Sequence, residues 1–149
     1  MSEPSNEIVS NEIVSKAAPK PVGLYPHARR VGNLLFLSGL GPRDPATNGV
    51  PGNVTDDAGR VIAHDIRAQC HSVFANVRTV LESAGARWED IVDVTVFLTD
   101  MEADFPAYNE VYAQYFAENR PTRTTVGISR LPTPIHIELK VIAVLSEGA

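Results

Sequence analysis

The segment Asn119–Val144, NRPTRTTVGISRLPTPIHIELKVIAV, decides the fold that we expect for this chain. From Ile135 onward its side chains alternate between two faces of an extended chain, which is the two-residue period of a β-strand. Both faces contain apolar residues, so we expect the strand to be covered on both sides. Glu138 must then find hydrogen-bond donors or stay partly unsatisfied. One face carries Ile135, Ile137, Leu139, Val141, Ala143 and Leu145, and the other carries His136, Glu138, Lys140, Ile142 and Val144.

Two segments have the periodicity of amphipathic helices. Residues 61–84 lack proline and glycine, and their apolar residues recur at three- and four-residue steps until Gly85 ends the run. The second segment has its apolar residues between Phe105 and Phe116. Asp104 is suited to cap a helix there, Pro106 is tolerated in the first turn, and Pro121 lies beyond the end. We therefore predict one helix over residues 61–84 and a second that starts at Asp104.

Further strands are predicted at residues 32–39 (GNLLFLSG), 90–98 (DIVDVTVFL) and 124–129 (TTVGIS). Residues 41–61 are rich in Gly, Pro, Asn and Asp, and this loop, centred on residues 43–60, is long enough to serve as a lid or rim. The order of strands, helix, strand, helix, strands predicts a mixed sheet of the α/β or α+β class with both helices on one side.

Length and composition favour one domain without a nucleic-acid or membrane partner. The chain has 149 residues and a net charge of −5, which provides no basic field for phosphates. Its single cysteine, Cys70, excludes an internal disulfide and suits the cytoplasm. No apolar run is long enough to cross a membrane. Residues 1–21 contain the repeat SNEIV twice and are expected to form a flexible tail before a domain at residues 22–149.

Arg123 and Glu138 are the residues most suited to chemistry. Each has a simpler interpretation. Arg123 can be a solvated surface charge, and Glu138 can be a surface carboxylate paired with Lys140 or with a neighbouring strand. An arginine can, however, grip a carboxylate with two parallel hydrogen bonds. A glutamate held between Ile137 and Leu139 can orient and deprotonate a water molecule.

Other single residues give weaker signals. Tyr25 is more often a packing residue, Ser38 can simply close a turn, and Asn109 can be an exposed helical side chain. The four histidines lack the spacing of a zinc site, and Cys70 lies on the apolar stripe of the first predicted helix. The chain also lacks a glycine-rich phosphate loop. We therefore expect neither a metal nor an organic cofactor.

Three segments together resemble the Rid family, the reactive intermediate deaminases. They are GLYPHARRVGNLLFLSG from Gly23, VLESAGARWEDIVDVTVFLTDMEADFPAYNEVYAQYF from Val80, and RPTRTTVGISRLP with IELKVIAV toward the end. The last is the most specific, because the family signature pairs an arginine with a glutamate fifteen residues later, as Arg123 and Glu138 are placed here. The resemblance covers nearly all of residues 22–145.

The resemblance implies a chorismate-mutase-like α+β fold, a mixed sheet with two helices on one face, assembled as a homotrimer with clefts between subunits. It implies that Arg123 binds the substrate carboxylate and that Glu138 positions the hydrolytic water. Tyr25, Ser38 and Asn109 match positions that line the cleft. Many members carry a cysteine two residues after the arginine, where this chain has Thr125, which argues against a mechanism that needs a thiol there.

The segment YPHARR and the long loop resemble bacterial 2-aminomuconate deaminases of aromatic degradation. That substrate is a dianion, so a second cation would be useful, and the candidates are His27, Arg29, Arg30 and Arg43. Two alternatives stay open. One is a broader deaminase of 2-imino and enamine acids that removes reactive intermediates, and the other is a non-catalytic trimeric module that binds carboxylate metabolites.

Overall fold

The computed structural model describes residues 10–146 and contains a six-stranded sheet in the order β1-β2-β3-β8-β6-β7. Neighbouring strands are antiparallel except β6 and β7, which are parallel and joined through helix α2. A separate hairpin consists of β4 and β5. The elements are β1 Ser10–Ile13, β2 Ala28–Val31, β3 Leu34–Leu37, β4 Val54–Thr55, β5 Val61–Ala63, α1 Ile66–Ser83, the 3₁₀ turn Trp88–Asp90, β6 Ile91–Leu98, α2 Met101–Phe116, β7 Thr122–Gly127 and β8 Ile137–Val144.

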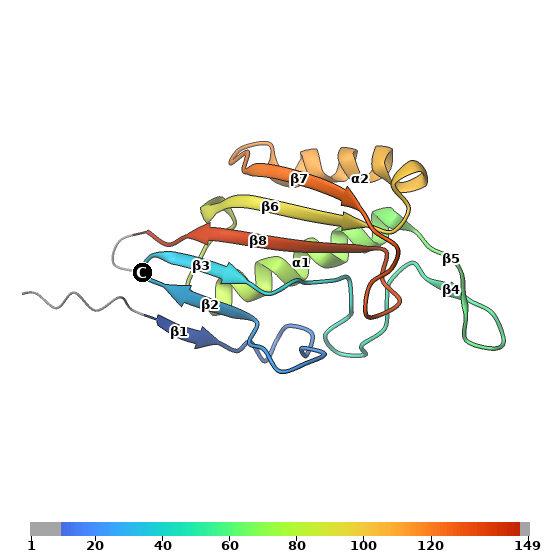
Figure 1. Ribbon diagram of the computed structural model, residues 1–149, viewed down its shortest axis with the longest axis horizontal. Helices are drawn as coiled ribbons and strands as arrows, with labels where there is room; N and C mark the ends of the chain where they lie inside the picture. The colour runs from blue at the N-terminus through green and yellow to red at the C-terminus, as the bar shows by residue number, and fades with distance from the viewer. Residues whose placement is uncertain (1–9, 147–149) are drawn as a thin grey trace, which may run out of the picture.

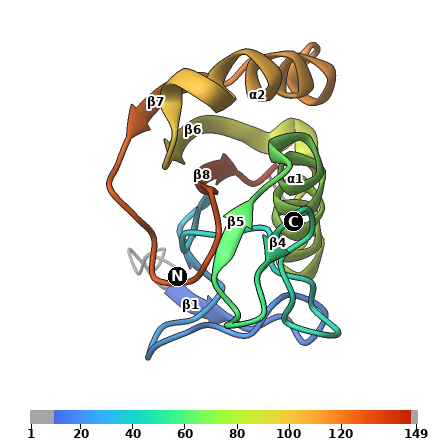
Figure 2. The ribbon, with the colours of Figure 1, turned by 90° about the vertical axis from the view of Figure 1, so that its right-hand side faces the viewer.

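Both helices cover one face of the sheet (Figures 1 and 2). The core lies between them and the central strands, where β6 and β8 contribute alternate residues, as the two-residue period predicts. This confirms the α+β class and the placement of both helices on one side. The side chains with no exposed surface include Val73 and Val77 of α1, Val94, Val96 and Leu98 of β6, and Ile137 and Val141 of β8.

Helix α1 begins later than predicted. The Asp65 carboxylate accepts hydrogen bonds from the N–H groups of Arg67 (3.0 Å) and Ala68 (3.3 Å), which fixes the first turn. Residues 61–63 instead form β5. The apolar residues before Asp65 fit the helical period, so the predicted helix wrongly continued past its true N-cap. Its C-terminus is as expected, because Gly85 has a φ of 77° and closes the helix in the left-handed conformation.

Helix α2 begins before Asp104, so the predicted cap is wrong. Asp100 is the N-cap, and its carboxylate accepts a hydrogen bond from the Ala103 N–H. Asp104 lies inside the helix and is buried. Pro106 follows in the interior, where it removes the hydrogen bond that its N–H would make to the Glu102 carbonyl.

The predicted flexible tail of residues 1–21 is wrong for its second part. The second copy of SNEIV forms β1, which pairs antiparallel with β2 and extends the sheet. The segment that follows returns to the body of the domain, with Ser15 and Ala18 buried. Residues 1–9, which contain the first copy, lie outside the described part of the chain.

A bulge separates β3 from the segment that follows it. Phe36 pairs with Ile142, whereas Leu40 pairs with Leu139 through two 2.9 Å backbone hydrogen bonds. Between these two pairs the chain runs four residues on the β3 side but only three on β8, so the β3 side contains one extra residue. The Lys140 ammonium donates a hydrogen bond to the Leu37 carbonyl at this point. The bulge brings Ser38 and the following glycine over the sheet face opposite the helices.

Two further observations concern membrane-spanning helices and the single cysteine. Between residues 10 and 146, no helix has the length and apolar character that a membrane crossing needs. Cys70 is buried in α1, and burial raises the pKa of its thiol to about 12.

Candidate active site

Glu138 projects from β8 on the sheet face opposite the helices, because its neighbours Ile137 and Leu139 are buried on the helix side. The side chain is half-buried, and burial raises the pKa of its carboxyl group. Within residues 10–146 that carboxylate has no hydrogen-bond or ion-pair partner. An unpaired, partly desolvated carboxylate has a lone pair available for a water or ligand proton.

Gly39 gives the Glu138 carboxylate its space. A Cβ atom at position 39 would lie 3.0 Å from the carboxyl carbon and from Oε2 of Glu138, tighter than most real contacts of this kind. The carboxylate can therefore approach the backbone of the bulge only because residue 39 lacks a side chain. Sequence reasoning missed this residue, although a glycine directly after a strand was the available signal.

Tyr25 and Ser38 line the same pocket as Gly39 and Glu138. The Ser38 hydroxyl donates a 2.8 Å hydrogen bond to the Pro26 carbonyl, which leaves its oxygen able to accept one. The Tyr25 hydroxyl accepts a hydrogen bond from the Val22 N–H at 3.2 Å. These two predicted site residues therefore lie beside Glu138.

Arg43 lines an adjoining pocket that also contains Tyr25, Gly39 and Glu138. Its guanidinium group donates hydrogen bonds to Oδ1 of Asn48 and to the Lys20 carbonyl, both at 2.8 Å. The predicted loop thus places one cation beside the carboxylate, as a rim would.

Arg123 and Asn109 form a second group, between β7 and α2. The Arg123 guanidinium donates a 2.9 Å hydrogen bond to Oδ1 of Asn109 and lies 4.7 Å from the ring centroid of Tyr112 and 5.4 Å from that of Tyr108. The Tyr108 hydroxyl is 3.0 Å from Oγ1 of Thr125. Aromatic stacking and one amide thus orient the arginine and leave several N–H groups for a carboxylate.

Within one chain the two groups lie on opposite faces of the sheet. Arg123 pairs with Val94 of β6, and Glu138 pairs with Phe97. Val94 and Phe97 are three residues apart, so their side chains point to opposite faces. From the strand rise and spacing, the Cα atoms of Arg123 and Glu138 are roughly 14 Å apart. A single small ligand cannot contact both side chains of the same chain.

His27 does not serve as the second cation that the sequence allowed. Its side chain is buried, Nδ1 accepts a 3.0 Å hydrogen bond from the Ser15 N–H, and Nε2 lies 2.8 Å from the Pro19 carbonyl. Both ring nitrogens are therefore engaged in holding the N-terminal segment. Arg29 and Arg30 extend from β2 and are not among the residues that line the Glu138 pockets.

No metal centre is apparent in the described part of the chain. Across residues 10–146, no three His, Cys, Asp or Glu side chains gather in an arrangement that could hold an ion.

Comparison with known proteins places the chain in a family. Residues 15–145 match the family described as endoribonuclease L-PSP. A solved structure from Yersinia pestis, described as a member of the conserved Rid protein family, has a TM-score of 0.80 and 32% identity and covers 92% of this chain and 100% of its own. The chain belongs to the Rid family. The likeness also confirms the chorismate-mutase-like fold.

Two curated relatives of this chain are informative. A RutC family protein of Pyrococcus abyssi is 42% identical over 131 residues, which are 88% of this chain and 94% of the relative. A Dermatophagoides farinae protein named 2-iminobutanoate/2-iminopropanoate deaminase is 33% identical over 133 residues, 89% of this chain and 94% of the relative.

Proposed function

We propose that the protein hydrolyses 2-imino acids, and the enamines that tautomerise to them, to 2-oxo acids and ammonia without a cofactor. The observation that carries the proposal is the Glu138 carboxylate, which is partly desolvated, faces the Gly39 bulge and has no partner among residues 10–146. The name of the Dermatophagoides farinae relative supports the same reaction.

Each residue has a defined role in this reaction. Arg123 binds the substrate carboxylate, which fixes the adjacent imine carbon. Glu138 removes a proton from water as the water oxygen adds to the carbon of the protonated imine, and the electron pair of the C=N double bond moves onto the nitrogen, which gives a neutral carbinolamine. Glu138 then returns that proton to the nitrogen, the C–N bond breaks to release ammonia, and the hydroxyl group gives up its proton to water as the carbonyl group forms.

We further propose that each site is shared by two copies of the chain in a homotrimer. One copy would contribute Arg123 and Asn109, and the next would contribute Glu138, Tyr25 and Ser38. The placement of Arg123 and Glu138 on opposite faces of the sheet supports this arrangement, because one chain cannot present both to a small ligand.

The finer proposal is that 2-aminomuconate is the preferred substrate. Its second carboxylate requires another cation, and Arg43 supports this assignment because it lines a pocket with Glu138. The competing substrate is 2-iminobutanoate, which has one carboxylate and no need of Arg43. The ratio of kcat/KM for the two substrates in the wild-type protein and in Arg43→Ala separates the assignments, since only the dianion should lose affinity in the variant.

The reaction is tested by ammonia release from enzymatically generated imino acids. We expect Glu138→Gln to fold normally and lose turnover by about 10²-fold or more, the usual contribution of a general base. Arg123→Ala should chiefly raise KM. Arg78→Ala is the matched control, because Arg78 also stacks on an aromatic ring, 5.1 Å from the centroid of Trp88, but lies outside the site.

Near-normal ammonia release by both Glu138→Gln and Arg123→Ala would refute the site. Binding of 2-oxo acids by the wild-type protein without ammonia release from any imino acid would favour the non-catalytic binding module instead.

A further inference from the structure

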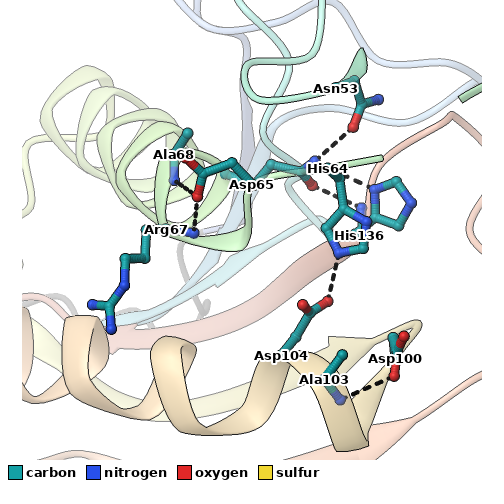
Figure 3. A network of polar contacts seen from close by, with 10 residues as sticks. Asn53, His64, Asp65, Arg67, Ala68, Asp100, Ala103, Asp104 and His136 are labelled. Carbon is teal, nitrogen blue, oxygen red and sulfur yellow. Dashed lines mark hydrogen bonds and ion pairs between the residues drawn. The ribbon is translucent and has the colours of Figure 1, made fainter. Parts of the chain in front are cut away.

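A polar cluster outside the proposed site joins five parts of the chain (Figure 3). Nε2 of His64, after β5, lies 2.7 Å from Oδ2 of Asp104 in α2. The His64 ring stacks on that of His136, just before β8, with centroids 3.7 Å apart and planes 7° from parallel. Gln69 of α1 and Asn53, before β4, complete the cluster.

The hydrogen bonds of this cluster fix the protonation of His136. Oε1 of Gln69 accepts a 2.9 Å hydrogen bond from the His136 backbone N–H, so the opposite atom of that amide is the donor. This Nε2 donates to Oδ1 of Asn53 at 2.8 Å and is 3.3 Å from Nδ1 of His136. Nδ1 must therefore accept, which requires a neutral imidazole with its proton on Nε2.

Protonation of His136 would break this arrangement. An N–H at Nδ1 would face the N–H of Gln69, and the positive ring would lie against the His64 ring. Burial and the nearby His64 lower the pKa of His136, while Asp104 and Asp100 oppose that effect. Arg130 lines the pocket beside the two rings and adds further positive charge.

The cluster supports one wall of the Glu138 pocket. The β7–β8 loop, residues 128–136, is held by the backbone of His136 and by a 2.6 Å hydrogen bond from Nδ2 of Asn53 to the Pro134 carbonyl. Thr133 and Ile135 of this loop line the pocket that contains Glu138 on one side and the pocket beside the histidine rings on the other. A movement of the loop would therefore reshape the Glu138 pocket.

We propose that the stacked pair His64 and His136 is a proton-sensitive support, in which protonation of His136 releases the β7–β8 loop and weakens substrate binding beside Glu138. The effect on substrate rests on the function proposed above. The release of the loop does not, because it concerns only the contacts of residues 128–136.

The direction of the pH dependence follows from the lowered pKa. An unperturbed histidine has a pKa of about 6.5. Since the folded protein binds this proton more weakly than the unfolded chain, the stabilisation of the loop is complete above that pH and is lost as the pH falls toward the lowered pKa of His136.

Hydrogen exchange of the His136 backbone amide tests the proposal without any substrate. After correction for intrinsic rates, we expect its protection factor to fall between pH 7.5 and pH 5 by up to about tenfold per pH unit, the limit for uptake of one proton. In His136→Asn the side-chain oxygen can replace Nδ1 as acceptor and cannot be protonated in this range, so protection of residue 136 should not change with pH.

His71→Asn is the matched control, because His71 lies on the exposed side of α1 and bonds Tyr115 outside the cluster. It should behave as the wild type does. A wild-type protection factor that is constant from pH 7.5 to 5, or an equal decrease in His136→Asn, would overturn the proposal. Loop exchange that varies with pH in a protein that releases no ammonia would retain the support and reject the deaminase.

In an active protein, KM should rise on acidification in the wild type and in His71→Asn more than in His136→Asn. Parallel KM profiles in all three proteins would show that the loop does not govern substrate binding, and would reject that part of the proposal.

Discussion

Tyr108 and Tyr112 both lie beneath the Arg123 guanidinium, but they differ in their hydroxyl groups. That of Tyr108 bonds Thr125, whereas that of Tyr112 is buried and has no partner among residues 10–146. Tyr112→Phe removes an unsatisfied group and should raise the free energy of unfolding by about 1 kcal/mol, while Tyr108→Phe should lower it by a similar amount. Denaturant titration of both variants is the measurement, and equal effects would contradict the difference in partners.

Glu138 combines a proposed catalytic role with a cost to stability. Its raised pKa means that the fold favours the protonated form, so the ionised carboxylate destabilises the protein at neutral pH, and the penalty disappears as the pH falls through the raised value. Glu138→Gln should therefore melt at a higher temperature than the wild type at pH 7. The gain should be at most about 1 kcal/mol, because solvent screens the half-exposed group.

The difference between the two proteins should become smaller at pH 4, where the wild-type carboxyl group is largely protonated. A melting temperature of Glu138→Gln below that of the wild type at pH 7 would indicate that the carboxylate has a stabilising partner after all.

Some site residues could be predicted from the sequence and others could not. An arginine and a glutamate at a family spacing are visible in one dimension, and Tyr25, Ser38 and Arg43 do lie beside Glu138. The role of Gly39 depends on a bulge that arises from the pairing of β3 with β8, so a glycine after a strand did not by itself show which side chain it makes room for. The burial of His27 could not be predicted, because it depends on the N-terminal segment that folds back over it through Ser15 and Pro19.

The bulge after β3 predicts a separation of activity from stability. Gly39→Ala would place a methyl group 3.0 Å from the Glu138 carboxyl group, which must then move away from the pocket. We expect ammonia release to fall at least about tenfold while the melting temperature changes little, since residue 39 is exposed. Gly127→Ala is the control, because the added Cβ would lie 3.7 Å from Met101, an ordinary contact.

Element types were easier to predict than element boundaries. Apolar periodicity identified both helices, β6 and β8, but caps decide where a helix begins, and here Asp65 and Asp100 prevail over the predicted starts. The strands β1 and β2 were missed because ARRV and SNEI contain few apolar residues. Such strands are stabilised by pairing with a neighbour, which a single-sequence pattern does not show.

A site shared between copies makes a specific prediction for mixed assemblies. Arg123→Ala keeps Glu138, and Glu138→Gln keeps Arg123, so a trimer that contains both variants can form intact sites at some interfaces. With random mixing of equal amounts in a cyclic trimer, about a quarter of the interfaces combine the two intact halves. At substrate concentrations well below the raised KM of Arg123→Ala, where neither variant alone releases much ammonia, co-refolding of the two should therefore restore about a quarter of the wild-type ammonia release.

Activity that stays absent after mixing, with light scattering showing that mixed oligomers have formed, would place Arg123 and Glu138 in unrelated sites. The control is a mixture of Arg78→Ala with Glu138→Gln. Both of these variants retain Arg123, so every interface whose Glu138 comes from an Arg78→Ala copy should be active, whichever copy supplies Arg123.

The buried thiol of Cys70 has a practical consequence for such experiments. With a pKa of about 12, almost none of it is thiolate at neutral pH, and the core shields it from reagents. A maleimide fluorophore should therefore leave the native protein unlabelled. A cysteine introduced at an exposed position would then carry a single dye, so that subunit exchange can be followed by energy transfer without first removing the natural cysteine.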